Sequence, residues 1–272
     1  MSLRNLSVKI KIPKLLENKL KNKKIKTIYL KFEKFLDINE NFIVAVSGGP
    51  DSLALAFLAK IYSLKKGLTP KFFIVDHKLR KESSREAKLV QKVLKKYSIK
   101  ADVLTWKGKR PLKNIQSFAR KIRFKLLYEQ CDRLKIKNIL LGHHSEDLIE
   151  NFFLRMVRGS GLKGLVSLSK KVEINGKNLF RPLLEQKKED LIFISSYCFD
   201  FFIKDPTNQN QKFKRIKVRK LIKELKIEGL DEDKILMTIK NLKLSNDLVE
   251  SHVKNNLRKN TFFSIKKHKL FI

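Results

Sequence analysis

The chain has 272 residues, and 62 Lys and Arg against 27 Asp and Glu give it a formal net charge of +35. Its 42% hydrophobic residues, 10 Gly and 6 Pro exclude a collagen-like, low-complexity or wholly disordered protein. The two cysteines, Cys131 and Cys198, form no CxxC pair, which excludes a disulfide framework, a zinc ribbon and a sequence-evident iron–sulfur site and favours a reducing compartment.

Residues 1–40 are predicted to form a basic lead-in that ends in a helix over 27–35, where Ile28, Phe32 and Phe35 recur at helical spacing. The lead-in has no continuous apolar segment and no small-residue cleavage site, which argues against a secretory signal; an organelle-targeting peptide stays open. Along the whole chain, Lys interrupts every apolar cluster well before the roughly 20 residues that a membrane-spanning helix needs.

Between residues 42 and 158, short apolar runs alternate with amphipathic stretches. Strands are predicted at 42–46, 72–75, 101–106 and 138–142, and helices at 52–65, 84–97, 115–134 and 146–158. The strands are near-continuous apolar runs, which indicates that both faces of the sheet are covered. The alternation therefore predicts an α/β fold with a doubly wound parallel sheet.

After Gly159 the pattern loosens. The chain continues with a predicted flexible loop over 159–165, the stretch RPLL at 181–184, a helix over 187–202 and a Lys-rich helical region over 213–258. We therefore predict three parts: the lead-in 1–40, an α/β catalytic domain over 41–210 and a small basic helical segment over 211–272.

The first candidate site is a loop between the strand at 42–46 and the helix that follows it. It consists of Ser47, Gly48, Gly49, Pro50, Asp51 and Ser52. In an open α/β sheet, ligands bind beyond the carboxyl ends of strands, and a helix N-terminus offers N–H groups and a positive dipole end to an anion. Glycines permit close backbone approach and unusual torsions, and the serines add hydroxyl donors. The loop is thus predicted to bind phosphate.

This loop differs from a Walker A loop, which ends in Gly-Lys-Ser/Thr where this chain has Pro50-Asp51-Ser52. It instead resembles the SGGxDS signature of the PP-loop ATP pyrophosphatases, which cleave between the α and β phosphates of ATP.

A second candidate site follows the predicted strand at 138–142. It contains His143, His144, Asp147 and Glu150 at the start of a helix. Asp147 and Glu150 lie one helical turn apart, so both carboxylates are expected to face one site, where such oxygen ligands suit Mg²⁺. Zinc binding and simple helix capping by acidic residues are the alternatives.

Two weaker features follow other elements. Asp76 and Arg80 come after the strand at 72–75 and are expected at the same sheet edge. Arg120 and Arg123 lie on one face of the helix at 115–134, where their guanidinium groups would clamp a phosphate of ATP or RNA or, alternatively, form a solvated basic face.

The positive charge has two readings as well. It predicts attraction to a polyanion, for which nucleic acid is the commonest partner, whereas a bias toward Lys, Ile, Asn and Phe from AT-rich coding would produce scattered surface lysines. An acidic lipid surface is a weaker option, since no segment pairs a clean apolar face with this charge.

With these residues assembled, the chain from about residue 42 to the 250s resembles the tRNA(Ile)-lysidine synthases, a family of PP-loop enzymes. Beyond the loop at 47–52, the resemblance rests on HHSEDLIENFFLRMVRGSGLKGL at 143–165, RPLL at 181–184, DPTN at 205–208 and RIKVR at 215–219. Three positions depart from the family pattern: Lys78 replaces a Gly, Glu146 an Asp and Asn151 a Thr. Longer members have a further C-terminal domain thought to help hold tRNA, and the present chain resembles a short form that stops at Ile272.

The resemblance implies an ATP-dependent ligase. The C2 oxygen of the wobble cytidine of an isoleucine tRNA with a CAU anticodon attacks the α phosphate and releases pyrophosphate; the amine of free lysine then displaces AMP. Residues 47–52 with Arg120 and Arg123 would bind ATP, and Asp51 and Asp147 would hold Mg²⁺. Asp147, His143 and Glu150 are candidates to take the proton of the lysine amine. Contacts to tRNA are expected from Arg155, Arg158, Arg215 and Arg219.

The resemblance also implies a place in the bacterial cytoplasm or in an organelle of bacterial descent. The short apolar runs predict no membrane association, and the sequence makes no obligate protein partner evident. Three alternatives are kept: a PP-loop enzyme that thiolates tRNA, a PP-loop ligase acting on a small metabolite, and a noncatalytic RNA-binding protein on the same scaffold. The thiolating enzymes generally rely on cysteines, whereas Cys131 and Cys198 are predicted to be packing residues in helices.

Overall fold

A computed structural model describes residues 13–80, 82–109, 111, 114–203, 214–264 and 269–271. The chain forms two compact units. The first comprises Met1–Ser145 and Lys170–Pro206, and the second comprises Glu146–Ser169 and Thr207–Ile272. This division groups residues 146–169, which lie inside the predicted 41–210 domain, with the C-terminal helices.

The first unit is built on a six-stranded sheet. Its strands are β1 (Phe42–Val46), β2 (Lys71–Asp76), β3 (Ala101–Thr105), β4 (Asn138–Leu140), β5 (Lys171–Ile174) and β6 (Lys177–Phe180). The spatial order is β3-β2-β1-β4-β6-β5, and every neighbouring pair is parallel except β5 with β6. The predicted parallel α/β sheet is confirmed.

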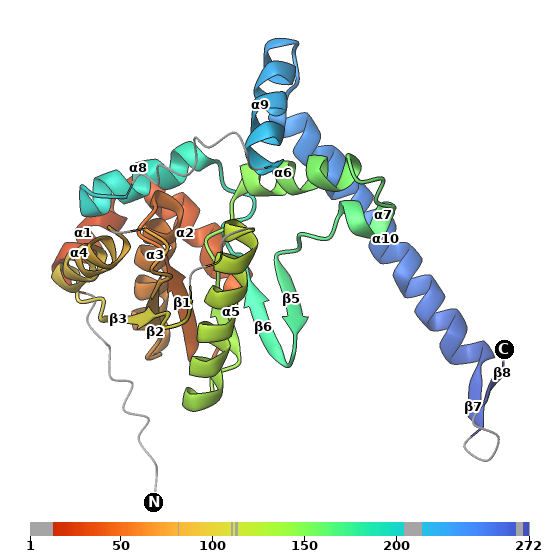
Figure 1. The fold of residues 1–272 in the computed structure, drawn as a ribbon, viewed down its shortest axis with the longest axis horizontal. Helices are drawn as coiled ribbons and strands as arrows, with labels where there is room; N and C mark the ends of the chain where they lie inside the picture. The colour runs from red at the N-terminus through yellow and green to blue at the C-terminus, as the bar shows by residue number, and fades with distance from the viewer. Residues whose placement is uncertain are drawn as a thin grey trace, which may run out of the picture. The chain divides into compact units, whose positions relative to one another are not determined.

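Helices cover both faces of this sheet (Figure 1). The helices of the first unit are α1 (Lys14–Leu20), α2 (Lys23–Leu36), α3 (Pro50–Lys66), α4 (Ser83–Lys96), α5 (Ile115–Leu134) and α8 (Lys188–Phe199). Phe42 and Val44 of β1 pack with α2, α3, α4 and α8, whereas Ile43, between them in sequence, packs with α5 on the other face. Since side chains alternate along a strand, an uninterrupted apolar run supplies both cores.

The hairpin of β5 and β6 is an element that sequence reasoning missed. Asn175 and Gly176 connect its strands with φ of 52° and 69°. An Asn-Gly pair with both φ values positive is the turn that matches the twist of two antiparallel strands. The adjoining prediction of a loop over 159–165 was wrong in part, because Leu162–Leu165 forms one helical turn, α7.

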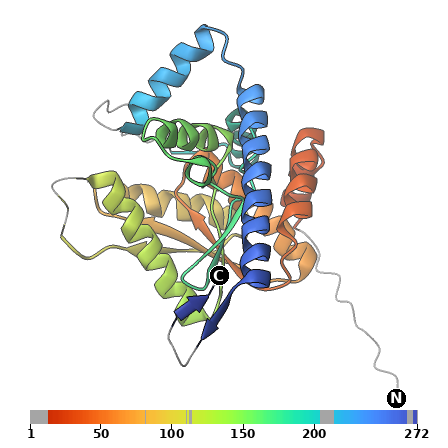
Figure 2. The same ribbon diagram turned by 90° about the vertical axis from the view of Figure 1, so that its right-hand side faces the viewer.

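The second unit consists of α6 (Ser145–Met156, whose first residue lies in the first unit), α7, α9 (Lys214–Ile227), α10 (Glu232–Asn260) and the hairpin of β7 (Phe262–Ser264) and β8 (Lys269–Phe271). Its small core joins Ile149 and Phe153 of α6 to Val218 and Ile222 of α9 and Ile239 of α10. Figure 2 shows α9 and α10 joined at one end as a helical hairpin. The predicted helical region over 213–258 is thus two helices that separate near Gly229, where φ is 94°.

Among the described helices, none combines the length and the apolar character that crossing a membrane requires.

Candidate functional site

The loop at 47–52 connects β1 to α3 and is closed by one hydroxyl group. Ser52 Oγ accepts hydrogen bonds from the backbone N–H of Ser47 (3.0 Å) and of Gly48 (3.1 Å), and it donates to the carbonyl oxygen of Gly49 (3.0 Å). Ser52 is buried whereas Ser47 is exposed. The loop therefore has a defined shape at the N-terminus of α3, where helical N–H groups lack an intrahelical acceptor.

The two glycines of this loop differ in backbone torsion and in the space around them. Gly48 has φ of 85°, and a Cβ added there would lie 2.5 Å from Val90 Cγ2. Gly49 has φ of −73°, which any residue adopts, and an added Cβ would meet only Ser47 Oγ at 3.8 Å. Backbone torsion thus explains Gly48, while the surroundings of Gly49 leave room for a ligand to approach.

Asp51 is the second residue of α3 and follows Pro50, whose fixed φ suits the first helical position. Its side chain is 25% exposed, and His144 Nε2 lies 3.7 Å from its Oδ2. A partly exposed carboxylate beside a phosphate loop fits the oxygen ligands that Mg²⁺ prefers. Among the described residues, no group of three or more His, Cys, Asp or Glu side chains could hold a metal, which gives the zinc alternative no support.

The segment after β4 runs directly against this site. His143 is half-buried, whereas His144 is 4% exposed and faces Asp51. Sequence reasoning named His143 as a catalytic candidate and gave His144 no role, because adjacent residues cannot be told apart by motif alone.

Asp76 at the end of β2 is buried and organises the loop that follows it. Its carboxylate accepts hydrogen bonds from Lys78 N (2.9 Å), Ser83 Oγ (2.7 Å) and Ser84 Oγ (2.5 Å). Burial acts to raise the pKa of Asp76, but these hydrogen bonds hold it below the usual value. Arg80, predicted at the same edge, pairs with Glu86 of α4 at 2.7 Å. In the described structure both residues thus stabilise the start of α4.

Arg120 and Arg123 lie on one side of α5, as predicted, since their guanidinium carbons are 5.2 Å and 5.6 Å from the centre of the Phe124 ring. Burial, followed by the charge of Arg123, lowers the pKa of His77 to about 4. Arg181, which follows β6, is buried, and burial together with the charge of Arg120 lowers its pKa to about 10. Positive groups therefore gather at the carboxyl ends of β2 and β6, and Arg181 is a member that sequence reasoning missed.

The second unit holds the remaining carboxylates of the predicted site. Glu150 is 3% exposed, and its Oε2 accepts a hydrogen bond from Arg219 Nε at 2.6 Å. Burial acts to lower the pKa of Arg219, but Glu150, followed by Asp147 and Glu146, raises it. These groups therefore form one acidic cluster around a guanidinium. Asp51 and Asp147 belong to different units, and their shared Mg²⁺ site stays a prediction.

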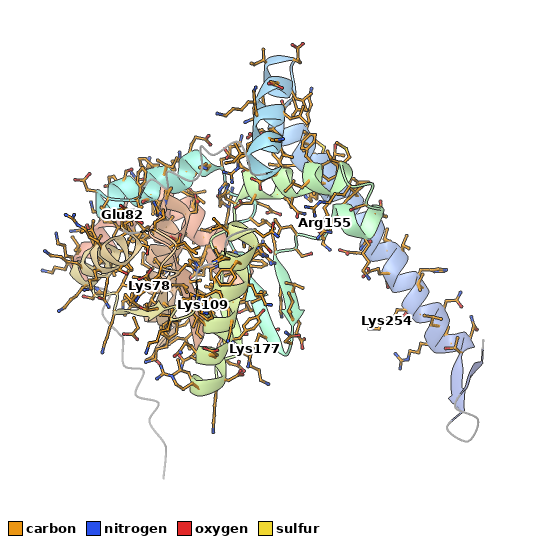
Figure 3. The ribbon with its side chains drawn as sticks, viewed as in Figure 1. Lys78, Glu82, Lys109, Arg155, Lys177 and Lys254 are labelled. Atoms are coloured by element: carbon orange, nitrogen blue, oxygen red, sulfur yellow. The ribbon has the colours of Figure 1, made fainter. Side chains whose placement is uncertain are left out.

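The predicted tRNA contacts all belong to the second unit. Arg155, labelled in Figure 3, is half-buried at the end of α6, and Arg158 is exposed beyond it. Arg219 is engaged with Glu150, while the neighbouring Lys217, Lys220 and Lys223 of α9 are exposed. The side chain of Arg215 and residues 205–208 lie outside the described residues.

Both cysteines are buried in helices, as predicted. Burial raises the pKa of Cys131 to about 11 and that of Cys198 to about 12. Because the thiolate is the reactive form, neither cysteine is prepared for sulfur chemistry.

Comparison with known proteins agrees with this arrangement. Residues 17–225 match the model of the PP-loop domain family. The tRNA(Ile)-lysidine synthase of Rhodopseudomonas palustris is 36% identical over 191 residues, which cover 70% of this chain and 55% of that protein. The synthase of Bradyrhizobium diazoefficiens is 35% identical over 210 residues, which cover 76% and 58%, and that of Orientia tsutsugamushi is 36% identical over 207 residues, which cover 76% and 47%.

The chain thus spans about half the length of the curated relatives it matches. Among solved structures, a U34-tRNA thiolase, NcsA from Methanococcus maripaludis, superposes with a TM-score of 0.67 at 18% identity, over 80% of this chain and 78% of that one. At this identity the likeness shows the fold alone.

Proposed function

The chain belongs to the PP-loop family, and on that premise we propose that it is an ATP-dependent ligase that converts the wobble cytidine of an isoleucine tRNA with a CAU anticodon to lysidine. The observation that carries the proposal is the Ser52-closed loop at the N-terminus of α3, in a chain about 35% identical to curated lysidine synthases. The reaction consumes ATP and free lysine, yields AMP and pyrophosphate, and belongs in the cytoplasm or in an organelle of bacterial descent.

The first unit would perform the adenylation step. The loop at 47–52 would bind the ATP phosphates, with Arg120 and Arg123 as further cationic contacts. Asp51 is the residue of this unit that would hold Mg²⁺, and a bound Mg²⁺ would supply positive charge beside the pyrophosphate leaving group; the role of Asp147 as a second ligand stays a prediction. The hydrogen bonds of Ser52 Oγ support this role, because they fix the shape of the loop at the N-terminus of α3, and a site whose shape is already fixed needs little rearrangement as charge develops.

Asp147 and Glu150 of the second unit and His143 of the first are the groups proposed to prepare lysine. A neutral amine is needed for attack on the cytidine, so a neighbouring base must take its proton. Asp147, His143 and Glu150 stay the candidates for this base, and Glu150 Oε2 accepts a hydrogen bond from Arg219 Nε. Exposed lysines of α9, with Arg155, Arg158 and Arg215, would contact tRNA phosphates through salt-dependent interactions.

The thiolase alternative is disfavoured by the buried, protonated cysteines. The metabolite ligase does not account for the net charge of +35. A noncatalytic RNA-binding role is separated from the proposal by ATP turnover.

The experiment is incorporation of labelled lysine into an isoleucine tRNA transcript with a CAU anticodon, in the presence of Mg²⁺ and ATP, with a CAU methionine tRNA as the specificity control. Asp51→Ala should abolish transfer, whereas Asp102→Ala, which removes an exposed carboxylate from β3, should leave it intact. Release of pyrophosphate without lysine transfer would refute the acceptor assignment. Release of neither product from folded protein at low salt would refute catalysis and favour the RNA-binding role.

A further inference from the structure

Two segments of the first unit approach each other closely at the first turn of α3. A Cβ added to Gly142, which follows β4, would lie 3.1 Å from the carbonyl oxygen of Asp51 and 3.2 Å from the backbone nitrogen of Ser52. These contacts are with backbone atoms, which cannot rotate away as a side chain does. The lack of a side chain at residue 142 therefore allows the segment after β4 to reach Asp51.

His144 uses this approach. Its side chain is excluded from solvent, and its Nε2 lies 3.7 Å from Asp51 Oδ2. The backbone around it is held at both ends: Leu141 N donates to the carbonyl oxygen of Phe180 (2.9 Å), and Ser145 N donates to that of Gln186 (3.0 Å). The imidazole is thus placed by backbone hydrogen bonds to other parts of the unit.

We propose that His144 is a positioning residue that orients the Asp51 carboxylate through its Nε2 atom. The proposal rests on the proposed function only in that this function gives Asp51 its role at Mg²⁺ and ATP. The distance is longer than a hydrogen bond, and we expect it to shorten when ligand binds, because hydrogen bonds of an active site are often long in ligand-free structures. Groups that orient a metal-binding side chain alter metal affinity by about 10–100-fold when removed.

The side-chain geometry offers a test that separates positioning from packing. The amide nitrogen of Gln lies about where Nε2 of His lies, whereas that of Asn lies about where Nδ1 lies, one bond short of Asp51. His144→Gln should therefore keep a donor near Asp51 Oδ2, and His144→Asn should lose it. His144→Leu replaces the imidazole by an apolar side chain of similar size that has no hydrogen-bond donor.

We would titrate each variant with Mg²⁺ and ATP by calorimetry, without tRNA or lysine. We expect His144→Leu and His144→Asn to weaken binding about tenfold or more, and His144→Gln to stay within about threefold of the natural protein. His252→Leu, the same change at an exposed position of α10, is the matched control and should bind normally. Normal binding by His144→Leu, or equal losses in the Gln and Asn variants, would overturn the proposal.

A second measurement uses no ligand. Unfolding midpoints are compared for His144→Leu, Asp51→Asn and the double variant, followed by the fluorescence of Trp106, the one tryptophan of the chain. If the side chains are coupled, the double variant shifts the midpoint by less than the sum of the single shifts. Additive shifts would overturn the proposal. Natural protein that binds Mg²⁺ and ATP but transfers no lysine would refute the proposed acceptor and leave the role of His144 standing.

Discussion

Two long helices, α3 of the first unit and α10 of the second, differ in how many of their residues are buried. Eleven of the 17 residues of α3 are buried, whereas the buried residues of α10, among its 29, are Ile239 and Asn246. Apolar side chains on α10 are exposed: Met237, Leu244, Leu248, Val249, Val253 and Leu257. Figure 3 shows side chains extending from both sides of the second half of α10, among them Lys254.

This difference bears on where chemistry is located. The loop at 47–52 is attached to the most thoroughly packed helix of the first unit, so the position of its donors is determined by many contacts at once. The α10 helix is held in its first half by the small core with α6 and α9, and near its middle by α7 through the pair Lys163–Glu250 at 2.9 Å. A rigid phosphate site and a less tightly packed basic unit suit the adenylation and RNA-contact roles proposed for them.

The largest expected effect comes from a direct test of this comparison, in which the same Leu→Ala substitution is made in each helix. Leu55→Ala in α3 removes a fully buried side chain and should lower the free energy of unfolding by about 2–5 kcal/mol. Leu248→Ala in α10, at a residue 73% exposed, should change it by less than about 0.5 kcal/mol. Urea unfolding followed by circular dichroism measures both. An equal loss for Leu248→Ala would mean that this face of α10 is covered in the protein.

A second prediction concerns the pH dependence of the stability of the first unit. The folded pKa of His77 is about 4 because of burial and Arg123, so the unfolded chain binds the proton more readily. The resulting stability is complete above about pH 6.5, the unfolded value, and is lost as the pH falls toward 4. Fluorescence of Trp106, in the first unit, should report a falling unfolding midpoint over this range.

His77→Gln should flatten that decline, since it removes the titrating group and keeps a polar side chain. Asp76, whose pKa is also lowered, loses its contribution only below its ordinary value of 3.8, outside the window. A decline of equal slope in His77→Gln would show that another group is responsible.

The third prediction concerns a pair within the second unit. Glu150→Gln removes the negative charge that pairs with Arg219 and should lower the free energy of unfolding by about 1–2 kcal/mol. The loss should be smaller than for a fully buried pair, because the Arg219 side chain is 40% exposed. Glu224→Gln is the matched control in α9, where the pair with Lys220 is 3.8 Å long and exposed. Helical circular dichroism during thermal unfolding should separate the two variants, and similar midpoints would contradict the importance of the Glu150 pair.

Much of the first unit could be predicted because its signals are local. An uninterrupted apolar run of five residues predicts that β1 is buried on both faces, and the residues of the phosphate loop are consecutive in the sequence. The β5–β6 hairpin was also within reach, since Asn175-Gly176 is a strong turn signal, but its strands are short and mostly polar, so they were overlooked. The α1 helix, seven residues long, offered too few turns for periodicity to show.

The site was less predictable because it depends on residues that are distant in sequence. The approach of His144 to Asp51 spans more than ninety positions, and the burial of Arg181 beside Arg120 depends on the order of β4 and β6 in the sheet. The pairing of Glu150 with Arg219 likewise requires α6 and α9 to share a core. A motif lists such side chains, but only the packing of the elements shows which of them meet.

The smallest expected effect tests a departure from the family pattern. Lys78, labelled in Figure 3, has φ of 50°, a left-handed conformation that costs a non-glycine residue about 1–2 kcal/mol, and it stands where the family pattern has Gly. Lys78→Gly should relieve this strain while the unfolded chain gains about 0.5–1 kcal/mol of backbone entropy, for a net stabilisation near 0.5 kcal/mol. The hydrogen bond from residue 78 N to Asp76 would be kept, since it uses the backbone.

Lys100→Gly, at an exposed lysine whose φ is not positive, is the control and should be destabilising by comparison, as measured by urea unfolding followed by the fluorescence of Trp106. A loss of stability in both variants would contradict the prediction. It would mean that the strain at Lys78, in a loop held by the hydrogen bonds to Asp76, costs less free energy than the backbone entropy that glycine adds to the unfolded chain.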